Sequence, residues 1–181
     1  MNVMNMSKVN QSRDGSSLLS WVIKIENSVE KLLGFCAVIG MVSLCVVVML
    51  QIVGRLFLDT PPVWTEELSR YLFIGTVAVS IGIAYKRGEL VSVELLYNAL
   101  STRNAHLFSA IIAAIIFAFG WILYPSAVQF AQIGEFQTSP TMFFPMSYVF
   151  SSTVLILLNL MFFSVLAFVK HVLSALKTGD A

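Results

Sequence analysis

The stretch that decides the fold lies at residues 32–54, which read LLGFCAVIGMVSLCVVVMLQIVG and include no Asp, Glu, Lys or Arg. Two further runs without these residues follow at 104–134 and 136–169. A helix needs about 20 predominantly apolar residues to cross a bilayer core of ~30 Å, so each run is long enough. A chain of 181 residues could not bury three such segments in a soluble core. The sequence therefore predicts an integral membrane protein.

The composition of the whole chain agrees with this prediction. Hydrophobic residues make up 57% and charged residues only 12%, whereas soluble domains carry about 25% charged residues. The net charge of +1 comes without a continuous basic stripe, which argues against nucleic-acid binding. Composition thus excludes a soluble enzyme and a nucleic-acid-binding module.

The apolar runs and the residues between them predict four transmembrane helices. Pro61 and Pro62 interrupt the chain after the first span, because proline cannot continue a helix. The third span is longer than a perpendicular helix needs, so we expect a tilt or a kink at Pro125. The predicted fold class is an all-α integral membrane protein. Its membrane domain covers 32–170, with spans at about 33–53, 66–85, 104–133 and 146–169.

Two amphipathic segments accompany the predicted spans. Residues 1–16 are polar and are expected to be mobile, and 17–31 repeat apolar residues at helical spacing. The latter pattern predicts a helix on the membrane surface with Trp21 at headgroup level, although a soluble packing helix would show the same pattern. A second short interfacial helix is expected at 92–100, anchored by Tyr97.

The distribution of Lys and Arg predicts the orientation. Nine of the 11 Lys and Arg residues lie in three segments, which are the N-terminal segment, the connection from Lys86 to Arg103, and the tail at 171–181 together with Lys170 just before it. The other two, Arg55 and Arg70, lie on the opposite side. The positive-inside rule places the basic side in the cytoplasm. We therefore expect a multi-pass protein of a bacterial inner membrane, with both termini inside the cell.

The densest polar feature is WTEELSR, which begins at Trp64. Arg70 is spaced to reach either Glu66 or Glu67 on one helix face, and Arg55 is a second possible cation for these acids. An arginine inside the span should be paired or face protein, because charge in the bilayer is costly. Two interpretations remain open: a helix-start cluster with an aromatic anchor, or a contact that fixes the hairpin or docks a partner subunit.

The residue types needed for catalysis or metal binding are sparse. His106 and His171 each stand alone at a helix end, so surface residues are favoured over metal or haem ligands. Cys36 and Cys45 lie on one helix, too far apart to bridge. No nucleophile elbow or glycine-rich phosphate loop occurs. We expect neither enzymatic activity nor a cofactor, and a membrane enzyme or b-type cytochrome is the least favoured alternative.

The spans themselves are suited to packing rather than to carrying cargo. Gly75 and Gly82 in the second span allow close approach of another helix. The other spans have no charged residue at their midpoint, whereas a stand-alone carrier usually needs ionisable or unwound elements there. The alternative is a self-sufficient four-helix homodimeric exporter, which would need a membrane-embedded acid that the first span lacks.

Several short motifs of this sequence occur together in one known family. They are Arg55, Trp64-x-Glu66-Glu67-x-x-Arg70, Gly75, Lys86-Arg87-Gly88, Val91-x-Val93-Glu94, Thr138-Ser139-Pro140 and Pro145. With these motifs the sequence resembles the small membrane subunit of tripartite ATP-independent periplasmic (TRAP) transporters, the DctQ/SiaQ-like proteins. Two departures concern Leu90, where many members have histidine, and Glu94, where many have aspartate.

The resemblance implies a transporter of three parts. A periplasmic binding protein captures an organic acid, of the sialic acid or C4-dicarboxylate class, and a large membrane subunit carries it with a sodium gradient. The small subunit scaffolds the large one and helps dock the binding protein, and sodium coupling resides on the large subunit. The residues expected to act as structural or interface residues, not as substrate ligands, are Arg55, Trp64, Glu66, Glu67 and Arg70.

Overall fold

The computed structural model describes residues 3–58, 62–90 and 102–179, and side chains within 19–58, 62–90 and 104–175. Four long helices make up most of this part of the chain. They are α1 (Val3–Phe57), α2 (Trp64–Lys86), α4 (Thr102–Ile133) and α5 (Ser147–Gly179), with the short 3-10 helix η1 (Gly134–Phe136) after α4. The predicted all-α fold is confirmed.

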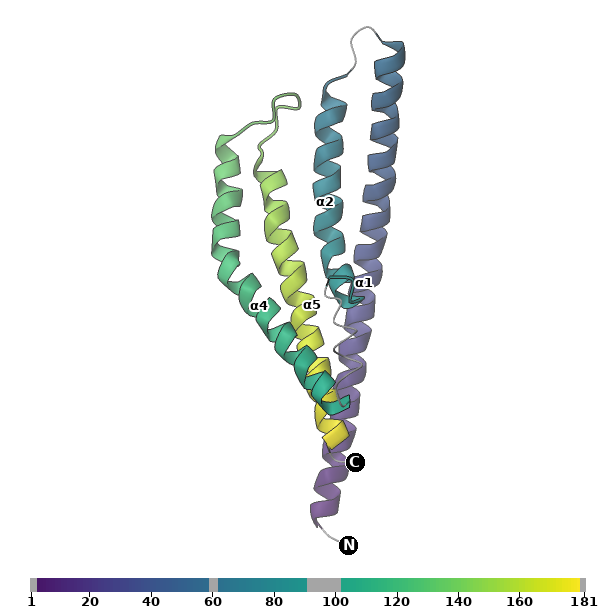
Figure 1. The fold of residues 1–181 in the computed structure, drawn as a ribbon, viewed down its shortest axis with the longest axis vertical. Coiled ribbons are helices and arrows are strands. Elements are labelled where there is room, and N and C mark those ends of the chain that lie inside the picture. Colours follow the sequence, from purple (N-terminus) through teal and green to yellow (C-terminus); the bar gives the residue numbers. More distant parts are fainter. Residues whose placement is uncertain (1–2, 59–61, 91–101, 180–181) are drawn as a thin grey trace.

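Each long helix contains a segment long and apolar enough to cross a membrane. These segments are Leu19–Phe57, Trp64–Lys86, Asn104–Phe136 and Ser147–Ala175. The predicted number of spans is therefore confirmed. In Figure 1 the start of α1 and the end of α5 lie at the lower end, and the end of α1, the start of α2 and the α4–α5 connection lie at the upper end. This antiparallel arrangement agrees with four crossings, and the cytoplasmic location of the lower end stays a prediction.

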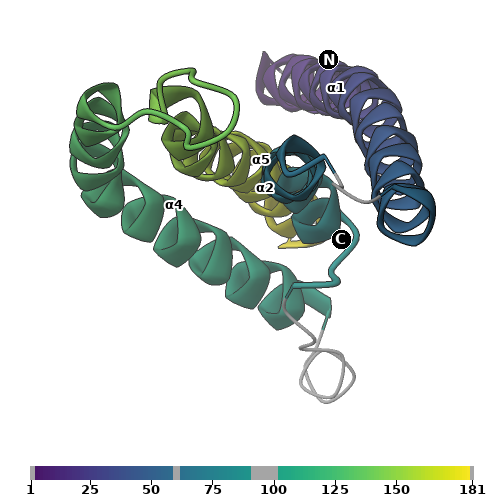
Figure 2. The ribbon, with the colours of Figure 1, turned by 90° about the horizontal axis from the view of Figure 1, so that it is seen from above.

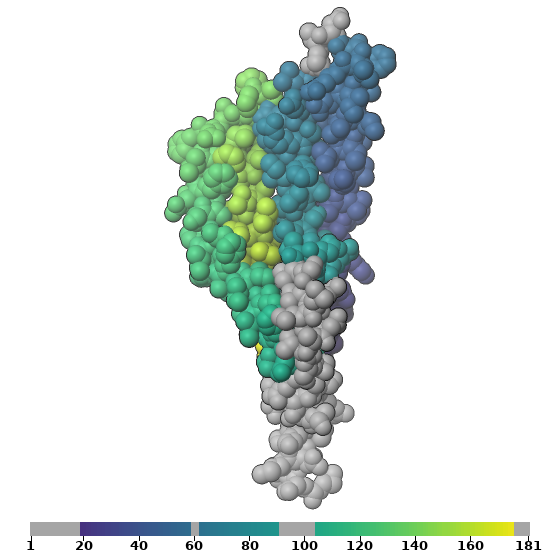
Figure 3. Space-filling view, in the orientation of Figure 1, coloured from purple at the N-terminus to yellow at the C-terminus, as the bar shows by residue number. Residues whose placement is uncertain are grey.

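The helices form a curved row rather than a closed bundle. α5 packs against α4 and α2, and α1 packs mainly against α2. Viewed from above, α1 and α4 flank the central α2 and α5 (Figure 2). The space-filling view shows the same order across one face, with α1 and α4 at its edges (Figure 3). Because each outer helix has few neighbours within the chain, much apolar surface stays exposed.

The N-terminal part differs from the sequence prediction. Residues 17–31 do not form a separate surface helix, and the segment 1–16, expected to be mobile, is helical from Val3, because α1 runs to Phe57 without a break. No proline interrupts it, and the carboxylate of Glu26 pairs with Lys86 of α2 and Lys170 of α5. Trp21 is exposed on this helix, and its predicted anchoring role stays untested.

The C-terminal half also departs in part from the sequence prediction. α5 continues to Gly179, so most of the tail predicted at 171–181 extends the helix. Pro125 lies inside α4, which is bent and crosses α5 with its lower half (Figure 1). A proline removes one helical hydrogen bond and commonly bends a helix. The predicted interfacial helix at 92–100, with Tyr97, lies outside the described residues.

Candidate functional site

Glu66 is the centre of the charged cluster at the upper end. Its carboxylate lies 3.3 Å from Nη2 of Arg55, across the α1–α2 connection. On the same helix, Nη2 of Arg70 lies 3.9 Å from the other carboxylate oxygen. All three side chains are more than half exposed, and exposed ion pairs contribute at most about 1 kcal/mol to stability. This cluster therefore contributes little to the stability of the fold.

Glu67 has a different environment from its neighbour. It accepts hydrogen bonds from the hydroxyls of Tyr71 and Thr141, and from the Thr141 backbone N–H at 3.1 Å. The sequence suggested that Arg70 reaches either carboxylate, but its ion pair among the described residues is with Glu66. Successive helical residues point about 100° apart, so Glu67 turns toward the α4–α5 loop instead.

The α4–α5 loop is shaped to meet α2. An isolated bridge joins Thr138 to Pro145, and the buried Ser139 bonds through its N–H to the Phe144 carbonyl at 2.9 Å. The ring of Phe144 packs edge-on against Tyr71, with ring centres 5.4 Å apart. The sequence pattern identified Thr138-Ser139-Pro140 but not its contact with α2. Only the Glu67–Tyr71 spacing of four residues hinted at this cluster.

The start of α2 also differs in detail from the prediction. Threonine is a common cap residue, but Thr65 does not cap this helix, because α2 begins at Trp64, and Val63 at the cap position makes no side-chain cap bond. The hydroxyl of the buried Thr65 instead donates to the Pro62 carbonyl at 2.7 Å. Trp64 is partly exposed, as suits an anchor or an interface residue.

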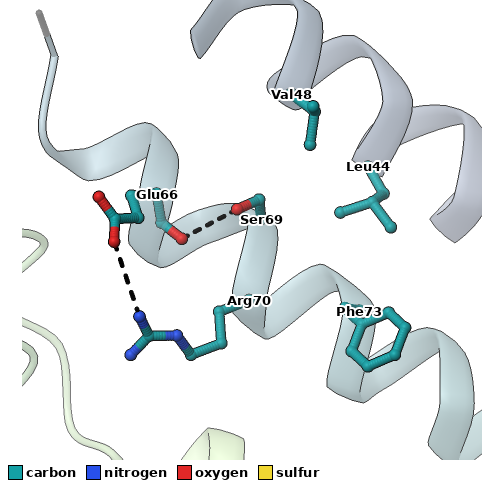
Figure 4. Close-up of a pocket in the computed structure, with 6 residues that line it drawn as sticks. All are labelled: Leu44, Val48, Glu66, Ser69, Arg70 and Phe73. Carbon is teal, nitrogen blue, oxygen red and sulfur yellow. Dashed lines mark hydrogen bonds and ion pairs between the residues drawn. The ribbon is translucent and has the colours of Figure 1, made fainter. Parts of the chain in front are cut away.

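A shallow groove runs between α1 and α2 beside the charged cluster. Figure 4 shows Glu66, Ser69, Arg70 and Phe73 on α2 and, across the groove, Leu44 and Val48 on α1. Its wall therefore changes from charged to apolar along α2. The sequence predicted the charges but not that α1 supplies the opposite wall.

A second ionic cluster lies at the lower end and was missed by the sequence analysis. Nζ of Lys86 lies 2.7 Å from both Asn27 Oδ1 and Glu30 Oε2, and 3.9 Å from Oε1 of the buried Glu26. Lys170 of α5 lies 3.7 Å from the other Glu26 oxygen. The cluster therefore ties α1, α2 and α5 together. The available signal was a Glu-x-x-x-Glu pair on the side predicted to carry the basic Lys86-Arg87 turn.

Glycine explains why α2 stops beside this cluster. Gly88 has a φ of 76°, a left-handed conformation that glycine adopts without steric cost. The N–H groups of Arg87 and Gly88 return to the carbonyls of Ile83 and Tyr85, each at 3.0 Å. The basic turn is therefore a helix terminus, and Leu90 follows it as an exposed residue.

Between the two ends, α2 and α5 contact each other through an uncharged polar side chain and through close packing. Asn159 of α5 is buried and donates through Nδ2 to the Ala78 carbonyl of α2 at 2.9 Å. A Cβ on Gly82 would lie 2.7 Å from Cε2 of Phe163, so this glycine permits close packing of α2 on α5. A Cβ on Gly75 would meet nothing within 4 Å. Gly75 therefore makes no close helix contact within the described part of the chain, and its predicted role in packing against another helix stays a prediction.

The two histidines come together although the sequence suggested that each is isolated. Nδ1 of His106 and Nδ1 of His171 lie 3.3 Å apart. Among the described residues no group of three or more His, Cys, Asp or Glu is placed to hold a metal ion. The structure thus makes this pair an interhelical contact rather than two unrelated surface residues.

These features define a multi-pass helical membrane protein with ionic clusters at both ends of its helices. The family of the tripartite ATP-independent periplasmic transporters, DctQ component, matches residues 44–177, more than half of the chain. The chain belongs to this family and is the small membrane subunit of a tripartite transporter. The resemblance drawn from the sequence is confirmed. No curated protein matches the chain.

Proposed function

We propose that this subunit is a non-catalytic scaffold in the bacterial inner membrane. It binds a large membrane subunit, which imports an organic acid of the sialic acid or C4-dicarboxylate class with a sodium gradient. It also helps to dock the periplasmic binding protein. No cofactor takes part on this chain, and both termini face the cytoplasm.

The absence of charge between the two ends carries this proposal. From Leu32 to Gly54 in α1, and from Tyr71 to Tyr85 in α2, the sequence has no Asp, Glu, Lys or Arg. The predicted spans in α4 and α5, at 104–133 and 146–169, also lack these residues. Glu135 lies beyond the end of the third span. Binding an ion or an organic acid at mid-depth requires charged or unwound elements there. The cargo path therefore belongs on another subunit.

The exposed apolar surface supports a scaffold role. In the apolar stretch of the α1 span only 6% of the residues are buried within the chain, compared with 22% in the apolar stretch of α5. Lipid can cover such a surface, and so can another helical protein. Gly75, with open space beside it, lies on α2 where a neighbouring helix could approach closely.

The exposed cluster of Arg55, Glu66 and Arg70 supports docking at the upper end. Its side chains can exchange weak intramolecular ion pairs for contacts with a partner at small cost. Charges at the rim of an interface mainly set orientation and association rate. If the basic lower end is cytoplasmic, this cluster faces the periplasm and can meet the binding protein.

Co-purification from the native membrane tests the scaffold role. An affinity tag on this chain should recover one large multi-span subunit in constant proportion under a mild detergent. Recovery of the chain alone would contradict the proposal. The experiment should be done once with the tag at the C-terminus and once with it at the N-terminus, so that a blocked interface is recognised.

Reconstitution tests the division of labour. Vesicles that contain this chain alone should take up neither sialic acid nor a C4-dicarboxylate under an inward sodium gradient. Adding the large subunit and the binding protein should give sodium-dependent uptake of one of them. Sodium-driven uptake by this chain alone would overturn the scaffold proposal.

A further inference from the structure

The facing histidines of α4 and α5 form a contact with unusual proton chemistry. His106 and His171 are the only two histidines in the chain. Their Nδ1 atoms are 3.3 Å apart while their ring centres are 5.6 Å apart. The two Nδ1 atoms are therefore on facing sides of the rings, as in a hydrogen bond between them.

Such a contact needs one proton between the two Nδ1 atoms. A neutral imidazole has one N–H donor and one acceptor nitrogen, and a cationic imidazole has two donors. The contact forms between two neutral rings, and also between one cationic and one neutral ring, because one Nδ1 still accepts. With both rings protonated, two N–H groups and two positive charges face each other. The pair therefore tolerates a first added proton and resists a second.

The charged groups around the pair do not relieve this repulsion. Among the described side chains, Lys170 is the residue before His171 on α5 and adds a positive charge. Glu26 from α1 is already shared between Lys170, at 3.7 Å, and Lys86 of α2, at 3.9 Å. The described side chains of α4, at 104–133, include no Asp, Glu, Lys or Arg, and the residue before them in the sequence is Arg103, a further cation. Among the described side chains, a doubly protonated pair would thus lack a dedicated carboxylate.

The two helices pack closely around the pair. Ala105 on α4 is 2% exposed and Ala175 on α5 is 6% exposed, so small side chains bring the backbones close near both histidines. The lower half of α4 crosses α5 in this region (Figure 1). The part-buried His106–His171 contact therefore lies between the two helices, and repulsion between two imidazolium rings would push these helices apart.

We propose that His106 and His171 form a pH-sensitive latch, which closes the lower ends of α4 and α5 and opens when both rings are protonated. The latch is independent of the proposed scaffold function, because it concerns the packing of two helices within this chain. At neutral pH it is closed. Acidification on the side of the membrane that holds this end opens it.

Nitrogen NMR of the imidazoles tests the proton sharing directly. The full chain, purified with a tag free of histidine and with a chelator present, has only two histidines to observe. We expect the two rings to be coupled, so that replacing either histidine by asparagine changes the titration of the remaining one. In His106→Asn and in His171→Asn the remaining histidine should titrate in one step. Equal midpoints in the wild-type chain, unchanged in both variants, would overturn the latch.

Distance measurements test whether the helices move. Spin labels at the exposed Leu107 of α4 and Phe168 of α5, with Cys36 and Cys45 replaced by alanine, should move apart between about pH 7.5 and about pH 4.5, beyond the usual range of histidine titration. The control pair, at Ile133 and Tyr148 near the upper end, should not. No increase at the lower end would overturn the proposal. So would an equal increase at both ends, or one that persists when both histidines are replaced by asparagine.

Discussion

Glu67 at the start of α2 accepts a hydrogen bond of 3.1 Å from the backbone N–H of Thr141, a residue 74 positions later in the α4–α5 loop. The Thr141 hydroxyl donates to the same carboxylate oxygen, and the Tyr71 hydroxyl donates to the other. One carboxylate thus joins the first helix hairpin to the second at the upper end of the molecule. Its neighbour Glu66 instead forms exposed ion pairs with Arg55 and Arg70.

This difference predicts unequal effects of two adjacent substitutions. Glu67→Ala should lower the midpoint of thermal unfolding by several degrees, because a backbone N–H and two hydroxyls lose their acceptor. Glu66→Ala should lower it much less, since its partners are exposed arginines. Unfolding followed by intrinsic fluorescence in detergent measures both. Equal midpoints for the two variants would show that the loop contact contributes nothing to the fold.

The lower ionic cluster predicts that Lys86 holds α1 in place. Lys86→Met should destabilise the chain by about 3 kcal/mol, because the buried Glu26 and the partly buried Glu30 lose a close cation. Arg87→Met should cost under about 1 kcal/mol, since that side chain is 60% exposed. Denaturation in mixed micelles gives the free energies, and hydrogen exchange in 19–31 reports whether α1 loosens. The idea fails if Arg87→Met is as harmful as Lys86→Met.

The two glycines of α2 predict opposite responses to alanine. Gly82→Ala should destabilise the chain by about 1–3 kcal/mol, because the new Cβ would overlap Phe163. Gly75→Ala should be neutral or stabilising, by up to about 1 kcal/mol, because alanine favours helix and nothing lies within 4 Å. The same unfolding assay compares them. A neutral Gly82→Ala would mean that the α2–α5 contact relaxes around an added methyl group without loss.

Arg70 predicts an effect on assembly without an effect on folding. Arg70→Ala should leave the free energy of unfolding of the isolated chain within about 1 kcal/mol of wild type, because its ion pair is exposed. The yield of co-purified large subunit or binding protein should fall several-fold, as expected for loss of an arginine at an interface. Ser69→Ala, a neighbour in the same groove, is the matched control. A wild-type yield of complex for Arg70→Ala would show that Arg70 takes no part in assembly.

The sequence was sufficient for the spans because bilayer insertion depends on a sum over about 20 residues. Three uncharged runs and one more polar span at 66–85 identified the four long helices of the described residues. Element ends were less predictable. Hydropathy reports where a helix meets lipid, and says little about where the helix itself stops, so α1 and α5 continue well beyond their apolar parts.

In the candidate site, too, contacts between residues close in the sequence could be predicted, and contacts between distant residues could not. The pairing of Glu66 with Arg70 followed from helical spacing, and Arg55 was a candidate because the connection from α1 is short. The partners of Glu67 could not be predicted in this way, since Thr141 belongs to a distant loop. For the same reason the meeting of His106 with His171 had no local signal.

By itself the sequence determined that this chain has four helices suited to lipid, and that its motifs belong to a tripartite transporter subunit. Only the tertiary structure decided which charges meet, that Gly82 packs on Phe163 while Gly75 stays open, and that two distant histidines face each other. Hydropathy and helical spacing act within one segment, and sequence shows them directly. Contacts between helices depend on how each helix is rotated and shifted against its neighbours, and that is set by the packing of the whole chain.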